Sequence, residues 1–167
     1  MNKNLIRNIF FGLLSVIIIS ACSDEENDDV TTSPQGITYD GTAYQLITGD
    51  FEKPNIALDN PLTVQGVRLG RMLFYEKKLS KDGSMSCASC HRQEDAFTDT
   101  AKFSEGVRGK LGKRQAMAIF NMAWNNNEFF WDGRAHLLRD QSLKPIEDSL
   151  EMDETLENVI EKLLKEQ

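Results

Sequence analysis

Apolar residues recur at helical spacing in two segments of the 167-residue chain. Residues 60–80 predict a helix that begins just after Pro61, because large apolar side chains return at the helical period there. Residues 153–166 give the clearer pattern, with acidic and lysine side chains on the opposite face. The apolar face of this second helix consists of Leu156, Val159, Ile160, Leu163 and Leu164. We expect Asp153 to cap its N-terminus.

Shorter elements are predicted between these two helices. Residues 115–124 predict a short buried helix, and a further helix is expected at about residues 134–142. Residues 101–114 contain three glycines and five basic residues, which is typical of a long loop. Residues 39–51 alternate only weakly and predict irregular structure or a short hairpin. These elements together predict an all-α domain.

The N-terminal residues predict a targeting segment. Lys3 and Arg7 precede an apolar run at residues 9–19, which is too short to span a bilayer and is typical of a secretory signal. Residues 19–22 resemble the end of a bacterial lipoprotein signal, so Cys22 is expected to become the lipidated first residue of the mature protein. An ordinary signal that leaves Cys22 free is the alternative.

An acidic segment follows the expected lipidation site. Residues 1–21 form the predicted signal, and residues 22–37 are acidic and poor in large apolar residues, so we expect a disordered tether. Removing the two basic residues of the signal takes the net charge from −7 to −9. This charge disfavours nucleic acid and anionic membrane surfaces as partners. The acidic run is also similar to a surface-export signal of some Gram-negative lipoproteins. We therefore expect a lipid-anchored envelope protein, on the periplasmic side or the outer-membrane surface.

The strongest chemical signal is the Cys-x-x-Cys-His motif of Cys87, Cys90 and His91. A disulfide or a thioredoxin-like redox pair would use both cysteines but leave the histidine unexplained. A zinc site would need a further ligand, and the only other histidine is His136. A c-type haem site uses all three residues, because the thiols add to the haem vinyl groups and the histidine ligates the iron. The motif therefore predicts one covalently bound haem c with His91 as the proximal ligand.

Four strings around this motif resemble the bacterial di-haem cytochrome c peroxidase family, which includes the MauG branch. They are residues 62–80, 86–99, 129–135 (FFWDGRA) and 141–152. The combination is specific because FWDGRA does not follow the haem motif of most cytochromes. Family members have two cytochrome-c-like helical domains, each with one haem motif. The resemblance implies that residues 38–167 form the N-terminal, peroxidatic domain of such a protein, built around one haem.

The resemblance also implies roles for individual residues. It places Trp131 between two haems as an electron bridge, and Gln141 and Glu151 in the distal pocket. A carboxylate there can take a proton from one peroxide oxygen and return it to the other, while a neutral amide orients the peroxide. The alternatives are that Glu151 is an ordinary acid near a helix start and that Trp131 is a core aromatic residue. Arg134 is expected to fix its loop or a haem propionate.

The chain departs from the family pattern in three ways. Aligned without gaps, Val107 occupies the position of a histidine that blocks the iron in many relatives, so we expect an open, five-coordinate iron. His136 is expected to face solvent. Gln115 replaces an asparagine that commonly helps to bind calcium, and its carbonyl can still coordinate that ion. No second Cys-x-x-Cys-His motif is present, which favours a fragment over a domain that pairs with a separate chain.

Two functions follow from these observations. The first is a peroxidase that reduces hydrogen peroxide to water with electrons from a small c-type cytochrome or a cupredoxin; oxidation of a partner protein is a variant of it. The alternative is a membrane-tethered mono-haem cytochrome c that carries electrons. Such a carrier normally has a second axial ligand, which closes the iron to small molecules. The candidate ligands are Met85, Met117, Met122 and Met152.

Overall fold

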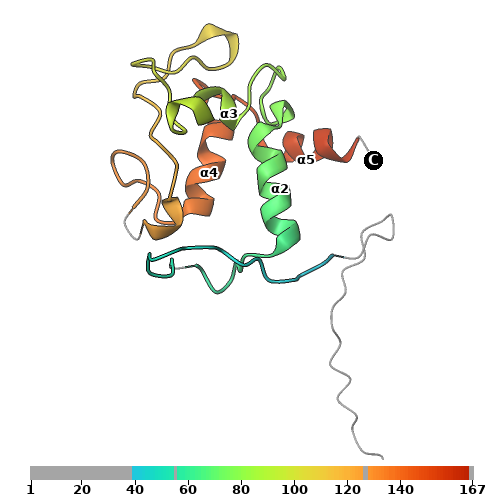
Figure 1. Cartoon of the computed structure of the whole chain (residues 1–167). Coiled ribbons are helices and arrows are strands. Elements are labelled where there is room, and N and C mark those ends of the chain that lie inside the picture. The colour runs from blue at the N-terminus through green and yellow to red at the C-terminus, as the bar shows by residue number, and fades with distance from the viewer. Residues whose placement is uncertain (1–38, 55, 126–127, 166–167) are drawn as a thin grey trace, which may run out of the picture. The chain divides into compact units, whose positions relative to one another are not determined.

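The computed structural model describes residues 39–54, 56–125 and 128–165 (Figure 1). Its α-helices are α2 (Val64–Tyr75), α3 (Cys87–Cys90), α4 (Leu138–Glu147) and α5 (Leu156–Leu164). Short 3₁₀ helices are η1 (Lys77–Leu79), η2 (Gln93–Asp95), η3 (Val107–Gly109) and η4 (Met122–Trp124). In these ranges β-structure is limited to isolated bridges. The predicted all-α fold is confirmed.

The predicted signal, Cys22 and the tether lie outside the described residues, so they remain predictions. In the part of the chain that the structure describes, none of the helices is long and apolar enough to cross a membrane.

Two predicted helices form, with shifted bounds. The Thr63 hydroxyl caps α2 by accepting a hydrogen bond of 3.0 Å from the Gly66 amide. Helix α4 begins four residues later than residues 134–142 predicted, because residues 129–135 close a tight loop of their own. In that loop the Phe129 amide donates to the Ala135 carbonyl at 2.7 Å.

The last helix, α5, is also present, but its predicted cap is wrong. The Thr155 hydroxyl accepts from the Asn158 amide at 3.2 Å and forms the cap instead. Asp153 lies before the cap with a φ of +52° and pairs with Arg108. The apolar face of α5 is only partly buried, because Ile160 and Leu164 are each 58% exposed.

The helix predicted over residues 115–124 is wrong except for η4 at its end. The backbone groups that a helix would pair internally are bonded to other segments. The Ile119 amide donates to the Phe97 carbonyl at 3.3 Å, and the Ala116 carbonyl accepts from the Thr98 hydroxyl at 2.5 Å. Asn121 then takes a φ of +58°, which interrupts a right-handed helix.

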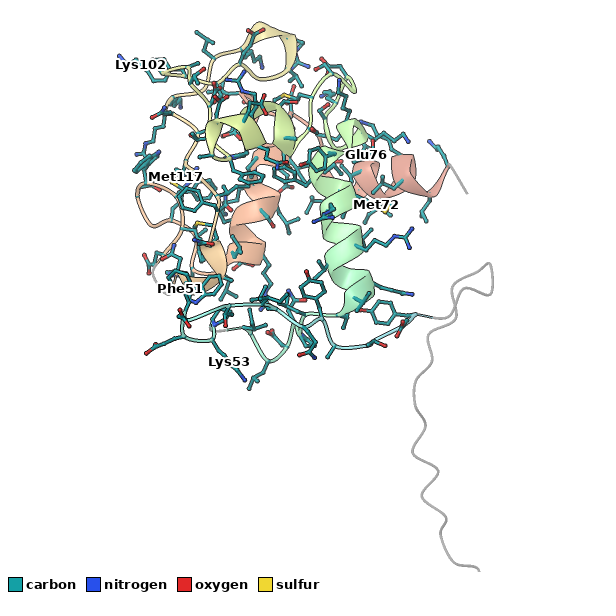
Figure 2. The ribbon with its side chains drawn as sticks, viewed as in Figure 1. Phe51, Lys53, Met72, Glu76, Lys102 and Met117 are labelled. Atoms are coloured by element: carbon teal, nitrogen blue, oxygen red, sulfur yellow. The ribbon has the colours of Figure 1, made fainter. Side chains whose placement is uncertain are left out.

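The N-terminal described segment is irregular, as its weak alternation predicted. Phe51, which is labelled in Figure 2, packs edge-on against Trp124 with ring centroids 6.3 Å apart. The Trp124 indole also donates to the Glu52 carbonyl at 2.7 Å. These contacts attach residues 51–52 to η4.

The core is small and gathers residues from both ends of the domain. Its buried members are Leu79, Met85, Val107, Ile146, Met152 and Val159. Cys87 and Cys90 pack against this cluster, as do Leu73, Leu156 and Leu163. Helix α2 contacts α3, and α5 contacts η1. The haem-motif helix is therefore held directly by the core.

A buried ion pair joins α5 to the end of η1. The Glu154 side chain is 4% exposed, pairs with Lys162, and accepts from the Thr155 amide at 3.0 Å. The Lys162 ammonium also donates to the Ser80 carbonyl at 2.8 Å. Hydrogen bonding to Lys162 lowers the pKa of Glu154 to about 2.

This pair predicts a specific loss of stability in acid. Because the folded-state pKa of Glu154 lies below its ordinary value of 4.5, its contribution is complete above pH 4.5 and is lost as the pH falls towards 2. Denaturant titrations at pH 5 and pH 3 should show that Glu154→Gln removes up to about 2 kcal/mol of the pH dependence of the unfolding free energy. Glu161→Gln, in an exposed pair with Lys165, is the matched control and should leave that dependence unchanged. A Glu154→Gln profile as steep as that of the wild type would contradict the assignment.

Candidate functional site

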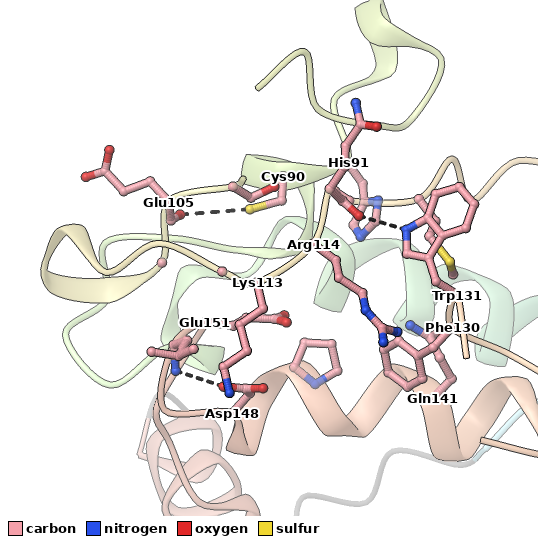
Figure 3. A pocket seen from close by; sticks show the side chains of 18 of the residues that line it. Cys90, His91, Glu105, Lys113, Arg114, Phe130, Trp131, Gln141, Asp148 and Glu151 are labelled. Atoms are coloured by element: carbon pink, nitrogen blue, oxygen red, sulfur yellow. Dashed lines mark hydrogen bonds between the residues drawn. The ribbon is translucent and has the colours of Figure 1, made fainter. Parts of the chain in front are cut away.

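A cavity of about 420 Å³ lies beside α3 and α4 (Figure 3). Its volume is in the range of roughly 300–1,000 Å³ that is usual for cofactor and small-molecule sites. Five of the predicted site residues line it: Cys90, His91, Trp131, Gln141 and Glu151. Cys87 does not line the cavity and packs against the core cluster. The structure therefore brings together residues that lie up to 61 positions apart in the sequence.

His91 is held by a backbone carbonyl. It follows α3 as the C-terminal cap, and its Nδ1 lies 3.1 Å from the Phe97 carbonyl oxygen. Because a carbonyl can only accept, Nδ1 is the donor in this contact, which leaves Nε2 as the ring nitrogen available to a metal. The supporting loop is closed by a 2.8 Å hydrogen bond from the Phe97 amide to the Arg92 carbonyl, and Ala96 and Phe97 have φ of +57° and +58°. This strained loop aims the carbonyl at the imidazole.

The two cysteines occupy the first and last positions of α3, one helical turn apart. Both are free thiols rather than a disulfide. Burial raises the pKa of both thiols, and the Cys90 Sγ lies 4.0 Å from the Glu105 carbonyl. A thioredoxin-like pair needs a thiol of lowered pKa, so this environment disfavours that alternative.

Glu151 reaches the cavity from the turn that follows α4. Its amide donates to the Asp148 carbonyl at 3.0 Å. Burial raises the pKa of the Glu151 carboxyl, the negative charge of Asp148 raises it further, and Arg134 opposes the shift. A carboxyl whose pKa is raised is better suited to accept a proton and release it again than an ordinary surface acid. This environment is unlike that of an ordinary surface acid.

Gly106 allows a close approach of two loops at this point. The Val107 amide donates to the Glu151 carbonyl at 2.8 Å. A methyl group on Gly106 would lie 2.0 Å from the Leu150 carbonyl oxygen and 2.8 Å from the Cα of Glu151. Only a residue without Cβ fits there. The φ of Gly106 is −93°, which any residue can adopt, so glycine is required here only by the close backbone contact. Such a contact leaves no local pattern in the sequence.

Trp131 lines the cavity but is 64% exposed, so it is not a core aromatic residue. Its indole nitrogen donates to the Gln115 carbonyl at 3.0 Å. Arg134 helps to fix the same loop, which is one of the two roles expected for it. Its guanidinium pairs with Asp132 at 2.9 Å and lies 3.5 Å from the centroid of the Phe130 ring.

Val107, which aligns without gaps with the blocking histidine of many relatives, does not line the cavity in this structure. Val107 is 1% exposed and belongs to the core rather than to the cavity wall. Packing decides its place, because the loop turns its only large apolar side chain of η3 inward. Among the described residues that line the cavity, His91 is the only histidine. His136 faces solvent as expected, with its side chain 79% exposed and paired with Glu128.

The remaining candidate ligands, the methionines and Gln115, lie partly inside and partly outside the cavity wall. Of the four methionines proposed as axial ligands, Met85 and Met117 line the cavity, whereas Met122 and Met152 do not. The side-chain nitrogen of Gln115 donates to the Asp99 carbonyl at 3.0 Å. In the described ranges no three acidic, histidine or cysteine side chains gather to hold a metal ion. Calcium at Gln115 therefore stays a prediction.

Comparison with known proteins identifies the relatives of this fold and site. The family model described as "Di-haem cytochrome c peroxidase" matches residues 64–167. The methylamine utilization protein MauG of Methylophilus methylotrophus is 32% identical over 116 residues, which cover 68% of the chain and 34% of that relative. The cytochrome c peroxidase Ccp of Escherichia coli is 38% identical over 107 residues, which cover 64% of the chain and 23% of that relative.

A solved structure agrees with these matches. The crystal structure of a MauG-like protein associated with microbial copper homeostasis superposes with a TM-score of 0.66 at 32% identity, covering 74% of the chain and 36% of that protein. The chain thus spans about a third or less of the length of these relatives.

The contact at Gly106 predicts that Gly106→Ala destabilises the domain by about 1–3 kcal/mol, because the added methyl group forces the backbone at residues 150–151 to move. Gly112→Ala is the matched control in the same loop, since its methyl group would meet nothing closer than 3.5 Å. Denaturant unfolding of the two variants measures the difference. Equal unfolding free energies for the two variants would show that the contact is not required.

Proposed function

Because the chain belongs to the di-haem cytochrome c peroxidase family, we propose that it forms the N-terminal, peroxidatic domain of an enzyme that reduces hydrogen peroxide to water. The electrons come from a c-type cytochrome or a cupredoxin. One observation carries the proposal: Gln141 and Glu151 line the same cavity as His91. A proton-transfer group and an amide thus accompany the expected iron ligand.

The residues of the cavity fit a covalently attached haem. Helix α3 carries two free thiols, of which Cys90 lines the cavity, and the Nδ1 contact of His91 leaves its Nε2 for the iron. Met85, Phe130 and Trp131 supply apolar wall, whereas Arg114 and Arg134 supply cations suited to propionates. When bound, the haem supplies an iron centre that exchanges electrons with peroxide.

The side chains of the chain handle the protons. Reduction of hydrogen peroxide to two waters consumes two protons and two electrons. Glu151 takes the proton from one peroxide oxygen and delivers it to the other, which then leaves as water. Gln141 orients the peroxide by hydrogen bonding and does not titrate, because its amide is neutral.

Trp131 is the proposed entry point for electrons. Its indole lines the cavity, yet 64% of the residue is exposed, so it can contact a second redox centre directly. The hydrogen bond to the Gln115 carbonyl fixes the indole plane.

We further propose that Cys22 carries a lipid anchor and holds the domain in the cell envelope of a Gram-negative bacterium.

A second candidate function rests on Met85 and Met117, which both line the cavity. If one of these methionine sulfurs were to ligate the haem iron as well, the site would be closed to peroxide and the chain would be a mono-haem electron carrier.

Optical spectra of the chain matured with haem distinguish the two functions. We expect a high-spin ferric spectrum that changes when peroxide is added, because the proposed peroxidase needs an open iron position. A low-spin spectrum with a methionine–iron charge-transfer band, unchanged by peroxide, would overturn the peroxidase proposal and support the carrier. Met117→Ala provides the matched test. If Met117 ligates the iron, its removal should change the low-spin spectrum to a high-spin one. If Met117 only lines the cavity, the spectrum should stay the same.

Substitution of Glu151 tests the proton-transfer role. Glu151→Gln should slow the stopped-flow reaction with peroxide by at least about 100-fold. The wild-type rate should fall as the pH drops through the pKa of Glu151, which lies above its ordinary 4.5, because the base must be deprotonated.

The same pH profile has a matched pair of variants. Asp148→Asn removes the negative charge that raises the pKa of Glu151, so the profile should move to lower pH. Glu147→Gln, on exposed α4 surface outside the cavity wall, should leave it in place. A profile that does not respond to Asp148→Asn would contradict the role of Glu151 as the titrating base.

A further inference from the structure

A second cavity, of about 640 Å³, lies outside the candidate haem site and shares no lining residue with it. We call it the aromatic hollow. Its lining residues are Arg71, Phe74, Tyr75, Gln93, Phe97, Ile119 and Phe120. Four of these seven residues are aromatic, one is cationic and one is a neutral amide. The composition is that of a small-molecule site, with apolar walls and few polar groups.

The walls are arranged before any ligand arrives. Arg71, Phe74 and Tyr75 lie three and four positions apart on α2, so they share one face of the helix. The Phe74 ring meets Tyr75 edge-on at 5.0 Å and Phe97 at 6.3 Å between centroids. These contacts fix three rings without filling the hollow.

The hollow carries a single positive charge. Arg71 is its only charged lining residue. Within the described residues the guanidinium of Arg71 forms no ion pair, whereas five other arginines pair with aspartates: Arg92, Arg108, Arg114, Arg134 and Arg139. A guanidinium that is exposed beside aromatic rings is suited to a planar anion.

We propose that the aromatic hollow binds a small aromatic carboxylate. The ring of the ligand lies against Phe74, Phe97 and Phe120. There it can form the edge-to-face contacts that the quadrupoles of aromatic rings favour. The carboxylate accepts charge-assisted hydrogen bonds from Arg71. The side-chain amide of Gln93 supplies a further hydrogen-bond donor for the carboxylate and, because it is neutral, adds no second charge to the hollow.

The hollow is joined to the haem site through one backbone carbonyl. The Phe97 carbonyl accepts from His91 Nδ1 at 3.1 Å and from the Ile119 amide at 3.3 Å. Phe97 and Ile119 both line the hollow. A ligand that presses on these side chains therefore acts on the acceptor that orients the expected iron ligand, and the proposal includes this coupling.

The experiment is calorimetric titration of the haem-loaded chain with phenylacetate, with phenylacetamide as the neutral isostere. We expect binding of phenylacetate and at least about tenfold weaker binding of phenylacetamide, because the amide lacks the charge that Arg71 recognises. Arg71→Gln should weaken the binding of phenylacetate by a similar factor. Arg68→Gln, on the same helix but outside the hollow, should not.

A second variant locates the site. Ile119→Trp fills the hollow and should abolish binding, with circular dichroism used to verify that the helices remain. Saturating phenylacetate should also shift the reduction potential of the haem in the wild type and not in Arg71→Gln. The readout is binding rather than turnover, so it is independent of the peroxidase proposal.

Three outcomes would overturn the proposal. They are the absence of binding at millimolar phenylacetate, equal affinity for the acid and its amide, and binding that survives Ile119→Trp, which would place the acid elsewhere. Binding with no shift of the reduction potential would overturn the coupling through Phe97.

Discussion

The contact between two loops at Gly106 is the constraint on which the site depends. There the backbone of Gly106 lies so close to that of Leu150 and Glu151 that no side chain fits between them. Three further links hold the same pair of loops: the hydrogen bond from Val107 to Glu151, the bond from the Lys110 ammonium to the Ser149 carbonyl, and the ion pair of Arg108 with Asp153. One contact thus sends Val107 into the core and Glu151 into the cavity.

The opposite wall of the cavity follows the same principle. His91 is oriented by a carbonyl in a short loop rather than by a neighbouring helix. Helix α3 has only four residues, so it can space the thiols but cannot fix the imidazole that follows it. Backbone hydrogen bonds to Arg92 and Ile119 give the loop the rigidity that the helix lacks. Loops joined by close backbone contacts therefore position the chemistry on both sides of the cavity.

This division explains what the sequence could predict. Helices α2 and α5 were predictable because their apolar residues repeat within one segment, and the haem motif because its spacing is local. Residues 115–124 had the same apolar content, but their backbone pairs with Phe97 and Thr98, which no local pattern encodes.

The site divides along the same line. Gln141, Trp131 and Glu151 were named from a family resemblance, and the structure places all three in one cavity with His91. Gly106 and Asp148 were not named, because their importance lies in what they approach across the fold. The burial of Val107 was not predictable for a related reason. An alignment counts residues along a loop, whereas packing decides which of them turns inward.

Two glutamates three positions apart show how the fold separates stability from chemistry. Glu154 is buried with a cation, Lys162, that lowers its pKa to about 2, so it remains ionised and fastens α5 to the body of the domain. Glu151 is withdrawn from water beside a like charge, so its pKa rises and its carboxylate becomes a stronger base. The residue type and the chain segment are the same. The surroundings that the fold supplies decide which carboxylate holds the structure and which is suited to acid–base work: an ammonium for Glu154, and burial together with a nearby aspartate for Glu151.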